Sequence, residues 1–359
     1  MEKRNIVFTG GGSAGHVTPN IAIIRELNKE EWNIFYIGSK SGIEKNLIEN
    51  INIRYYGISS GKLRRYISFE NITDIFRVFK GCVEARTVLR KLKPNIVFSK
   101  GGFVSVPVII AAKVLKIPIY IHESDLTPGL ANKISKRFAT KIFTSFEETV
   151  KYFPENKTMF IGSPIRREIL LGSAEKGRKY LDFHTKLPIL TIMGGSLGAK
   201  KINETVHAAI EQLTKKYQIV HICGKNNIDP HLTDIKGYKQ FEYIHNELAD
   251  ILAATDIVIT RGGSNSIFEF LALKIPMIII PLSLQQSRGD QILNAKLFEE
   301  KGYSITLEEK ELTSHNLLAY LELVKDKRRE MKISMNSYSK KDALSFLINE
   351  IGREHNGRK

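Results

Sequence analysis

One stretch of the sequence reads Thr260-Arg261-Gly262-Gly263-Ser264-Asn265-Ser266-Ile267-Phe268-Glu269, and apolar runs flank it at 257–259 and 270–273. This pattern predicts a strand, a glycine turn and a helix that Ser264 or Asn265 caps. The free N–H groups and the dipole at such a helix start favour an anion. Glu269 falls about one and a half turns into the helix. Its carboxylate would either accept hydrogen bonds from sugar hydroxyls or lie on the surface as an ordinary Glu.

Strand–helix alternation continues on both sides of this stretch and predicts parallel sheets with helices on both faces. In the first half we expect strands at 5–9, 33–37, 96–99, 119–121, 141–143 and 159–161. In the second half we expect them at 189–193, 219–223, 240–243, 257–260, 277–280 and 303–305. A Gly/Ser/Pro cluster at 162–167 interrupts the alternation and indicates a hinge. The predicted fold class is α/β, with two Rossmann-like domains whose parallel sheets face a cleft.

The chain has 359 residues, and its 54 Lys and Arg against 38 Asp and Glu give a net charge of +16. The length suits two α/β domains. The charge implies an anionic partner, which would be nucleic acid, phosphorylated metabolites or an anionic membrane. Cys82 and Cys223 lie far apart in the sequence and are expected to be free thiols without the spacing of a metal site.

No targeting or membrane-spanning segment is expected. Residues 1–8 lead straight into a strand, so no signal peptide is visible. The most apolar stretch, 103–121, contains two prolines and two lysines. These interruptions favour a helix followed by a buried strand over a transmembrane span.

Glycines gather where predicted strands end, at 10–15, 101–102, 194–198 and 262–263. Ligands bind at the carboxyl ends of parallel strands, so these loops predict a cleft between the two domains. The first loop has the G-x-G-x-x-G spacing, but the second strand ends without the acidic residue that binds a dinucleotide ribose. The loop at 194–196 is similar to a phosphate-binding turn and lacks the lysine of a P-loop, so ATP hydrolysis is not expected.

Three side chains near these loops are candidates for chemistry. His16 has a tunable pKa that suits a general base, and the alternative is a capping or packing histidine. Glu123 would orient a substrate or a histidine, or cap the helix that follows it. Arg166 would bind a phosphate through two hydrogen bonds, or be a solvated arginine. No Asp-x-Asp pair stands at a strand end, so a metal-dependent transferase is not expected, and we predict neither a metal nor a cofactor.

These motifs together resemble the MurG family, the lipid-I N-acetylglucosaminyltransferases of bacterial peptidoglycan synthesis, which are two-domain GT-B glycosyltransferases. The resemblance covers essentially the full length and rests on residues 9–19, 101–103, 122–123, 132–133, 194–199, 261–269, 290–291 and 294–295. It implies inverting transfer of GlcNAc from UDP-GlcNAc to the muramyl sugar of undecaprenyl-pyrophosphoryl-MurNAc-pentapeptide (lipid I), which gives lipid II. It also implies that no metal is essential.

The resemblance further implies a set of donor-binding residues, with Ile244 contacting uracil through its backbone and Glu269 holding the ribose hydroxyls. The set comprises Ser13, Ala14, Gly15, Arg166, Ser196, Ile244, Ser264, Asn265, Ser266, Ile267, Phe268, Glu269 and Gln291. Two loops depart from many members, with Ser13-Ala14 in place of Thr-Gly and Glu123-Ser124-Asp125 in place of Glu-Gln-Asn. Asp125 is therefore expected to replace an asparagine as a substrate contact.

The charges of the reaction suggest which of these residues act on which group. Without a metal, the leaving UDP would be stabilised by backbone N–H groups at Ser196, by the helix start at Ser264 and by Arg166. We expect His16 to accept the proton of the acceptor hydroxyl, with Glu123 or Asp125 as the alternative base. The resemblance places the acceptor and membrane-facing domain at 1–163 plus 340–359 and the UDP-GlcNAc-binding domain at 164–339.

A lipid-linked acceptor implies a peripheral protein on the cytoplasmic face of the cell membrane. A mixed basic and apolar segment is expected to contact the anionic leaflet, and the alternative is a helix that packs on the core. The segment comprises residues 62–69, Ile72, Ile75, Phe76, Arg77, Phe79 and Lys80. Two other functions stay open: a different lipid-surface transferase, such as a diacylglycerol glycosyltransferase, and a basic nucleic-acid-binding protein. We expect no nucleic-acid partner.

Overall fold

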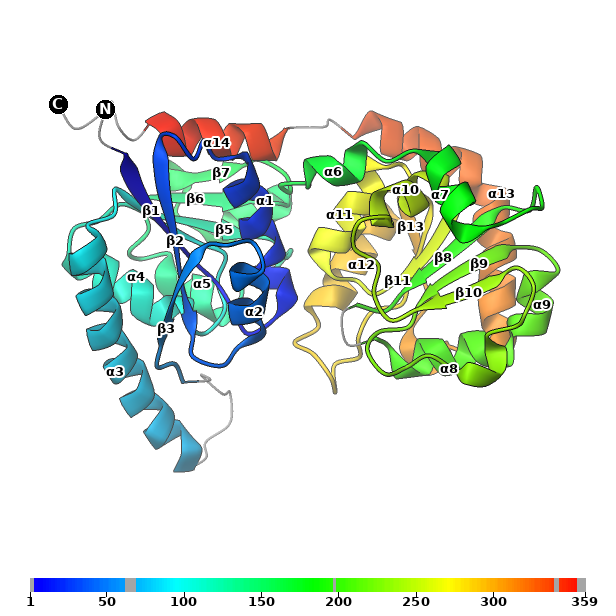
Figure 1. Ribbon diagram of the computed structural model, residues 1–359, viewed down its shortest axis with the longest axis horizontal. Helices are drawn as coiled ribbons and strands as arrows, with labels where there is room; N and C mark the ends of the chain where they lie inside the picture. The colour runs from blue at the N-terminus through cyan, green and yellow to red at the C-terminus, as the bar shows by residue number, and fades with distance from the viewer. Residues whose placement is uncertain (1–2, 62–68, 196–197, 339–341, 354–359) are drawn as a thin grey trace. The chain divides into compact units, whose positions relative to one another are not determined.

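The computed structural model describes residues 3–61, 69–195, 198–338 and 342–353, and for 69–73 the backbone alone. The chain divides into two compact units, which Figure 1 shows together. Unit 1 comprises Met1–Pro164 and Lys341–Lys359, and unit 2 comprises Ile165–Lys340. The change from unit 1 to unit 2 therefore falls inside the Gly/Ser/Pro segment that interrupts the strand–helix alternation.

Unit 1 is built on a seven-stranded parallel sheet in the order β3-β2-β1-β4-β5-β6-β7. Its strands are β1 (Arg4–Thr9), β2 (Trp32–Ser39), β3 (Arg54–Ile58), β4 (Ile96–Ser99), β5 (Ile119–Glu123), β6 (Lys141–Thr144) and β7 (Thr158–Phe160). In β1, Ile6 and Phe8 belong to one hydrophobic cluster and Val7 to another. Successive side chains of a strand point to opposite faces, so both faces of this sheet are buried.

Helices cover the two faces of the unit 1 sheet. The unit contains α1 (Thr18–Glu26), α2 (Ile43–Glu49), α3 (Phe69–Leu92), α4 (Ser105–Val114), α5 (Leu130–Ser135) and α14 (Ala343–Arg353). Side chains of α1, α2 and α14 share the cluster of Ile6 and Phe8, whereas those of α3 and α4 share the cluster of Val7. Pro19 lies in the first turn of α1, as predicted.

Unit 2 repeats the architecture with a six-stranded parallel sheet in the order β10-β9-β8-β11-β12-β13. Its strands are β8 (Ile189–Met193), β9 (Gln218–Ile222), β10 (Tyr238–Phe241), β11 (Ile257–Thr260), β12 (Met277–Ile279) and β13 (Ser304–Thr306). Its helices are α6 (Arg167–Leu170), α7 (Ala174–Leu181), α8 (Lys200–Ala208), α9 (Ile210–Thr214), α10 (Leu248–Ala254), α11 (Ser264–Ala272), α12 (Asp290–Glu300) and α13 (Ser314–Ser337). Side chains of α8, α9 and α13 share one cluster with Leu190 and Ile192 of β8.

The last described helix, α14, belongs to unit 1 although it follows all of unit 2 in the sequence. Its Leu347 and Ile351 are fully buried in the cluster that contains Phe8. The Nη1 of Arg4 in β1 donates to the Gly352 carbonyl at 3.1 Å. Unit 1 therefore combines the two ends of the described chain.

The predicted fold class is confirmed, and each expected strand is present within a residue or two of its expected bounds. Strand β3 was not predicted. It pairs only with β2 in the seven-stranded sheet, and four of its five residues are exposed or half-buried. An edge strand of this kind lacks the alternating apolar pattern that identifies a strand in the sequence.

Candidate active site

The carboxyl ends of β1, β4 and β5 meet at one edge of the unit 1 sheet, because these strands are parallel neighbours. Glycine loops follow β1 and β4, as predicted. Gly102 has a φ of +81°, and a Cβ atom at this position would lie 2.1 Å from the Gly11 carbonyl oxygen. The two loops therefore pack backbone against backbone, which requires glycine. This packing brings the two loops together at the candidate site of unit 1.

His16 ends a short 3-10 turn, Ala14–His16, directly after the first glycine loop, and it is partly exposed. Its Nδ1 lies 3.0 Å from the backbone carbonyl oxygen of Lys100. A carbonyl only accepts, so in the neutral ring Nδ1 carries the proton and Nε2 carries the lone pair. That tautomer suits a general base that acts through Nε2. Ser13 and Gly15 in the same loop are exposed, and Ala14 is partly exposed.

Three buried titratable side chains lie at the ends of β4 and β5: Lys100, His122 and Glu123. The Nζ of Lys100 hydrogen-bonds to Nδ1 of His122 and to Oγ of Ser124. Burial lowers the pKa of Lys100 to about 7, although the carboxylates of Glu123 and Asp125 act in the opposite direction. Burial, and then the Lys100 cation, also lowers the pKa of His122 well below its usual range. His122 is therefore neutral at physiological pH, whereas Lys100 changes charge near it.

Glu123 organises the loop that follows β5. Its Oε1 accepts from the backbone N–H of Asp125 at 3.0 Å. Its Oε2 accepts from the backbone N–H of Gly129 at 3.0 Å and from Nδ2 of Asn132 at 2.9 Å. Gly129 is the N-cap of α5, so Glu123 bonds the residue that precedes this helix, but no side chain caps its first turn, and the alternative that Glu123 caps the helix is wrong. Burial and then the Asp125 charge raise the pKa of Glu123, and its part in catalysis stays a prediction.

Glu44 supports the first glycine loop and was not predicted as a site residue. It lies fully buried in α2, and its Oε2 accepts from the backbone N–H of Gly12 at 3.2 Å. Its Oε1 accepts from the backbone N–H of Ser39 at 3.0 Å and from the Ser39 hydroxyl at 2.5 Å. No local pattern distinguishes this glutamate from a surface residue, because its partners lie at the ends of two different strands, β1 and β2.

Residues 260–269 form the candidate site of unit 2. Strand β11 leads through Gly262 and Gly263 into α11, as predicted. The prediction that Ser264 or Asn265 caps this helix is wrong, because Gly263 is the N-cap and no side chain bonds it. A glycine N-cap contributes no side-chain acceptor to the first turn, which suits a helix start that binds an anionic ligand.

The residues of α11 that were predicted to bind the donor differ in exposure. Ser264 is buried, whereas Asn265 and Ser266 are partly exposed. Ile267 and Phe268 are 0% and 5% exposed, and the Phe268 ring packs on Phe298 at 5.3 Å between centroids. Any contact that Ile267 or Phe268 makes with a substrate must therefore use backbone atoms.

Arg166 and Glu269 form a bidentate ion pair within unit 2. Nε of Arg166 lies 2.8 Å from Oε1 of Glu269, and Nη2 lies 3.0 Å from Oε2. The alternatives of a solvated arginine and an ordinary surface glutamate are therefore wrong. A planar fork of this kind also matches a phosphate, and a carboxylate that holds it keeps its own lone pairs for hydroxyl donors. The residues lie 103 positions apart, so no local sequence pattern indicates the pair.

Gln291 and Ile244, two other predicted donor residues, also belong to unit 2, as does Asn294. Oε1 of Gln291 accepts from the backbone N–H of Leu282 at 3.1 Å, so this side chain organises the loop after β12. Asn294 is fully buried and donates to the Gly262 carbonyl at 3.1 Å. Ile244 follows β10 with its side chain buried, which is compatible with a backbone contact to uracil. Ser196 lies outside the described residues.

His207, His221 and Cys223 bring one potential metal-ligand atom each to within 4.8 Å of one another. The cysteine spacing in the sequence predicts no metal site, but it contains no information on His207, which lies on a different element, α8. However, both ring nitrogens of His221 have protein partners, since Nδ1 lies 2.8 Å from the Tyr238 hydroxyl and Nε2 lies 3.0 Å from Oδ1 of Asn203. Burial also raises the pKa of the Cys223 thiol to about 12. We therefore interpret the group as a buried hydrogen-bond network.

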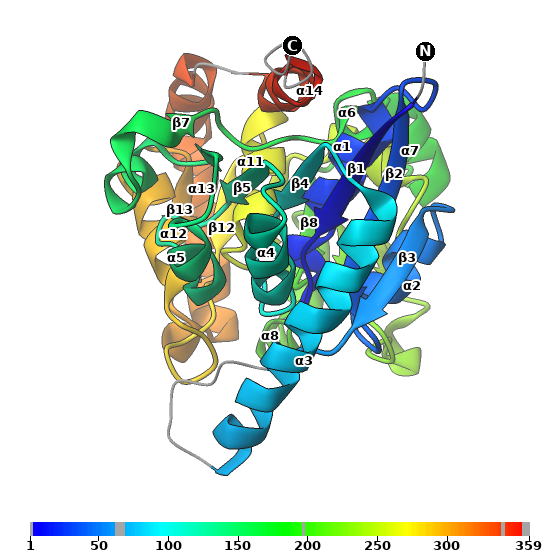
Figure 2. The same ribbon diagram turned by 90° about the vertical axis from the view of Figure 1, so that its left-hand side faces the viewer.

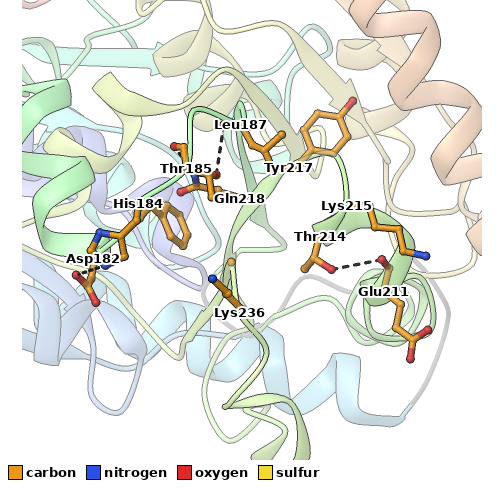
Figure 3. A pocket seen from close by; sticks show the side chains of 12 residues that line it. Asp182, His184, Thr185, Leu187, Glu211, Thr214, Lys215, Tyr217, Gln218 and Lys236 are labelled. Atoms are coloured by element: carbon orange, nitrogen blue, oxygen red, sulfur yellow. Dashed lines mark hydrogen bonds and ion pairs between the residues drawn. The ribbon is translucent and has the colours of Figure 1, made fainter.

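A cavity of about 450 Å³ lies at the opposite end of the unit 2 sheet from these loops. Its lining includes Leu187, Gln218 and Gly237, which come at or just before the starts of β8, β9 and β10. Figure 3 shows Gln218 beside Thr185, with Lys215 and Lys236 at other positions of the wall. None of the predicted site residues lines this cavity, so it is separate from the candidate site.

Helix α3 carries an exposed apolar stripe. Ile75, Phe76 and Phe79 are 63%, 71% and 71% exposed, and Arg77 and Lys80 are exposed beside them. The alternative that these apolar side chains face the core is therefore wrong. The first turns of α3 project beyond the rest of unit 1, as Figures 1 and 2 show. Residues 62–68, and the side chains of Phe69 and Ile72, lie outside the described part of the chain.

Among the helices formed by the described residues, none is both long enough and apolar enough to cross a membrane.

Two family models match the chain over most of its length. The model of the Glycosyltransferase family 28 N-terminal domain matches residues 6–144, and that of the Glycosyltransferase family 28 C-terminal domain matches residues 189–348. The crystal structure of Acinetobacter baumannii MurG superimposes with a TM-score of 0.76 over 98% of this chain and 100% of that structure, at 22% identity. That likeness supports the fold alone.

Similar sequences specify the family more closely. A Bacillus cereus protein named UDP-N-acetylglucosamine--N-acetylmuramyl-(pentapeptide) pyrophosphoryl-undecaprenol N-acetylglucosamine transferase 2 is 56% identical over 97% of this chain and 99% of its own length. A Shouchella clausii protein with the same name, without the final number, is 54% identical over 98% of this chain and 99% of its own length. The chain therefore belongs to glycosyltransferase family 28, within the MurG group of N-acetylglucosaminyltransferases.

Proposed function

We propose that this protein transfers N-acetylglucosamine from UDP-GlcNAc to the muramyl sugar of lipid I, which gives lipid II in peptidoglycan synthesis. The observation that carries the proposal is the 56% identity to a transferase of that name over 97% of the chain. The strand-end loops agree with it, since each unit presents glycine-rich backbone and convergent polar groups at the carboxyl edge of a parallel sheet.

In this proposal unit 2 binds the donor. The start of α11 and the Arg166 guanidinium favour the negative charge that builds on UDP as the anomeric C–O bond breaks. Glu269 accepts hydrogen bonds from the ribose hydroxyls while it holds Arg166 in place. Ser264, Asn265, Ser266 and Gln291 complete the donor site, with the backbone of Ile244, Ile267 and Phe268.

In the same proposal unit 1 binds the acceptor and moves the proton. The acceptor hydroxyl oxygen attacks the anomeric carbon from the face opposite UDP, so a new C–O bond forms as the old one breaks. Nε2 of His16 takes the hydroxyl proton, because this atom carries the lone pair in the tautomer that the Lys100 carbonyl fixes. The product is the inverted glycoside and the leaving group is UDP.

Turnover of UDP-GlcNAc with a water-soluble lipid I analogue tests this function. We expect UDP release and a disaccharide product in equal amounts, and we expect a diacylglycerol acceptor to give no product. The opposite acceptor preference would instead support a diacylglycerol glycosyltransferase. A chelator should leave the rate unchanged, because the proposal assigns no step to a metal.

We further propose that the α3 stripe of Ile75, Phe76 and Phe79 binds the membrane surface, flanked by Arg77 and Lys80. Apolar side chains that are 63–71% exposed beside cations suit insertion into an anionic leaflet. Each basic group near such a surface contributes about 1 kcal/mol. The location that follows is the cytoplasmic face of the cell membrane, as a peripheral protein.

A pair of matched charge reversals tests the membrane proposal. Arg77→Glu with Lys80→Glu should weaken binding to anionic vesicles at low salt, because two attractive charges become repulsive. Arg90→Glu with Lys91→Glu makes the same charge change in exposed residues at the far end of α3, and it should weaken binding less. Both pairs should turn over the soluble acceptor at the normal rate. Equal losses from the two pairs would point to net charge rather than to this stripe.

A further inference from the structure

Lys100 is a buried amine that the proposed mechanism has not used. It follows β4, and it is 2% exposed. Its Nζ hydrogen-bonds to Nδ1 of His122, within β5, and to Oγ of Ser124, the first residue after β5. Ser124 lies in the loop where this chain departs from the pattern of the family it resembles. The side chain of Lys100 therefore connects the ends of two neighbouring strands at the site.

The backbone N–H and carbonyl of Lys100 also form hydrogen bonds. Its N–H donates to the Thr9 carbonyl at the end of β1, at 3.1 Å. Its carbonyl accepts from Nδ1 of His16 at 3.0 Å. Lys100 begins the loop after β4, and through its N–H, its carbonyl and its amine it contacts residues at the ends of both neighbouring strands, β1 and β5.

We propose that Lys100 is a positioning residue for the glycosyl-acceptor half of the site: its amine fixes His122 and Ser124, and its carbonyl fixes the ring of His16. This inference rests on the proposed function, because it gives His16 the role of the base. Lys100 touches neither substrate in the proposal. It acts through its contact with His16, which takes the proton of the acceptor hydroxyl in the proposal.

The hydrogen-bond directions make the role specific. Nε2 of His122 faces the Gly162 carbonyl, which only accepts, so in the neutral ring the proton is on Nε2 and Nδ1 accepts from Nζ of Lys100. Nε2 can then donate to the Gly162 carbonyl, which lies 3.4 Å away. Gly162 belongs to the segment that leads out of unit 1. A continuous chain of contacts therefore runs from His16 through Lys100 and His122 to Gly162. This residue lies close to Pro164, where the first segment of unit 1 ends.

Packing alone does not explain a lysine at this position. A buried amine loses its hydration, and a methionine would fill a similar volume without that cost. The groups that face it are His16 from the first loop, His122 and Glu123 from β5, and Asp125 from the next loop, and burial still lowers the pKa of Lys100 to about 7. A costly buried group at the ligand-binding edge of a sheet is more typical of a functional site than of a core.

Lys100→Met tests the proposal, with Lys113→Met as the control because Lys113 is an exposed lysine on the neighbouring helix α4. We expect Lys100→Met to lower kcat roughly 10- to 100-fold, as a small misplacement of a reacting group does. The affinity for UDP-GlcNAc, measured by calorimetry, should match the wild type, because unit 2 is unchanged. The control should change neither value.

Two further measurements separate positioning from a merely structural role. The ¹⁵N NMR signals of His122 should show the Nε2-protonated tautomer in the wild type and a changed or mixed tautomer in Lys100→Met. Ser124→Ala, at a partly exposed residue, should lower kcat less, and its effect should shrink when Lys100→Met is already present, because both remove one network. The second variant keeps the test valid if Lys100→Met folds poorly.

The failures of the two proposals are distinguishable. A wild-type protein that binds UDP-GlcNAc and does not glycosylate a lipid I analogue would overturn the proposed function, and the NMR experiment would still decide the role of Lys100. An unchanged His122 tautomer together with an unchanged kcat in Lys100→Met would overturn the inference alone. Additive effects of Lys100→Met and Ser124→Ala would also overturn it.

Discussion

The strand-end sites of unit 1 and unit 2 use the same architecture with opposite electrostatics. In unit 1 the charged groups behind the glycine loops, Lys100 and Glu123, are buried and bonded to neutral partners. In unit 2 the charged groups, Arg166 and Glu269, are partly exposed and paired with each other. Burial favours the neutral form of a titratable side chain, whereas a nearby opposite charge favours the charged form. The difference matches the two tasks of the proposed glycosyl transfer. In that proposal unit 1 moves a proton and unit 2 holds an anion.

The largest effect on chemistry is expected from His16→Ala in unit 1. Loss of a general base typically lowers kcat about 10²- to 10⁴-fold. Donor affinity should be unchanged, because the proposal gives His16 the proton transfer and no contact with the donor. Steady-state kinetics and calorimetry measure the two effects, with the exposed His231→Ala as a control. Equal losses of rate and donor affinity would make His16 a donor-binding residue and would break the comparison.

The next largest effect is expected from Leu347→Ala in α14, which tests where unit 1 ends. This fully buried side chain belongs to the unit 1 core, so its truncation should cost about 2–5 kcal/mol of stability. Hydrogen exchange should become faster in the strands of unit 1, while the strands of unit 2 keep their protection. Leu323→Ala on α13, a residue that is 38% exposed, is the matched control. Equal loss of protection in both units would show that they unfold as one.

A smaller effect is expected from Glu269→Ala in unit 2. Loss of a carboxylate that serves a guanidinium and two hydroxyls should weaken UDP-GlcNAc binding by about 1.5–3 kcal/mol. The rate at saturating donor should change much less. Glu175→Ala, an exposed glutamate of α7, should leave calorimetric binding unchanged. Unchanged donor affinity in Glu269→Ala would remove the ribose assignment and reduce the ion pair to a structural contact.

The last expected effect is a pH dependence of stability that comes from Lys100. Its pKa is about 7 in the folded protein, below its usual value of 10.5. Between these values the unfolded chain binds the additional proton, so stability should rise with pH by up to about 1.4 kcal/mol per pH unit. Denaturant titrations of the wild type and of Lys100→Met between pH 7 and pH 10 should differ in this slope. Parallel slopes would mean that the lysine is charged in both states.

The sequence predicted the fold well because the signals of a parallel sheet are local. Runs such as 189–193 and 257–260 are buried on both faces, and their apolar composition identified their bounds without error. Strand β3 was missed, since Tyr55 and Gly57 at a sheet edge carry no such signal. The cap of α11 was misassigned, because Ser264 is a good N-cap residue and the structure uses Gly263 instead.

The candidate site was predicted only where residues are consecutive. The loops at 10–16 and 262–269 were found in this way. The Arg166–Glu269 pair and the contacts of Lys100 and Glu44 join residues from different strands, so their detection requires the topology. For the same reason the sequence leaves Glu123 open as a base. Its three hydrogen-bond donors become visible only in the structure.

The position of α14 has a consequence for how the protein is made. The strands of unit 1 are synthesised first, yet one face of their sheet is completed by Leu344, Leu347 and Ile351. All of unit 2 emerges from the ribosome before these residues do. Until then Ile6 and Phe8 lack part of their covering, and the nascent unit 1 exposes apolar surface. Unit 2 contains all of its own strands by residue 306 and has no such delay. The unit that is translated first is therefore expected to be the last to reach its native state.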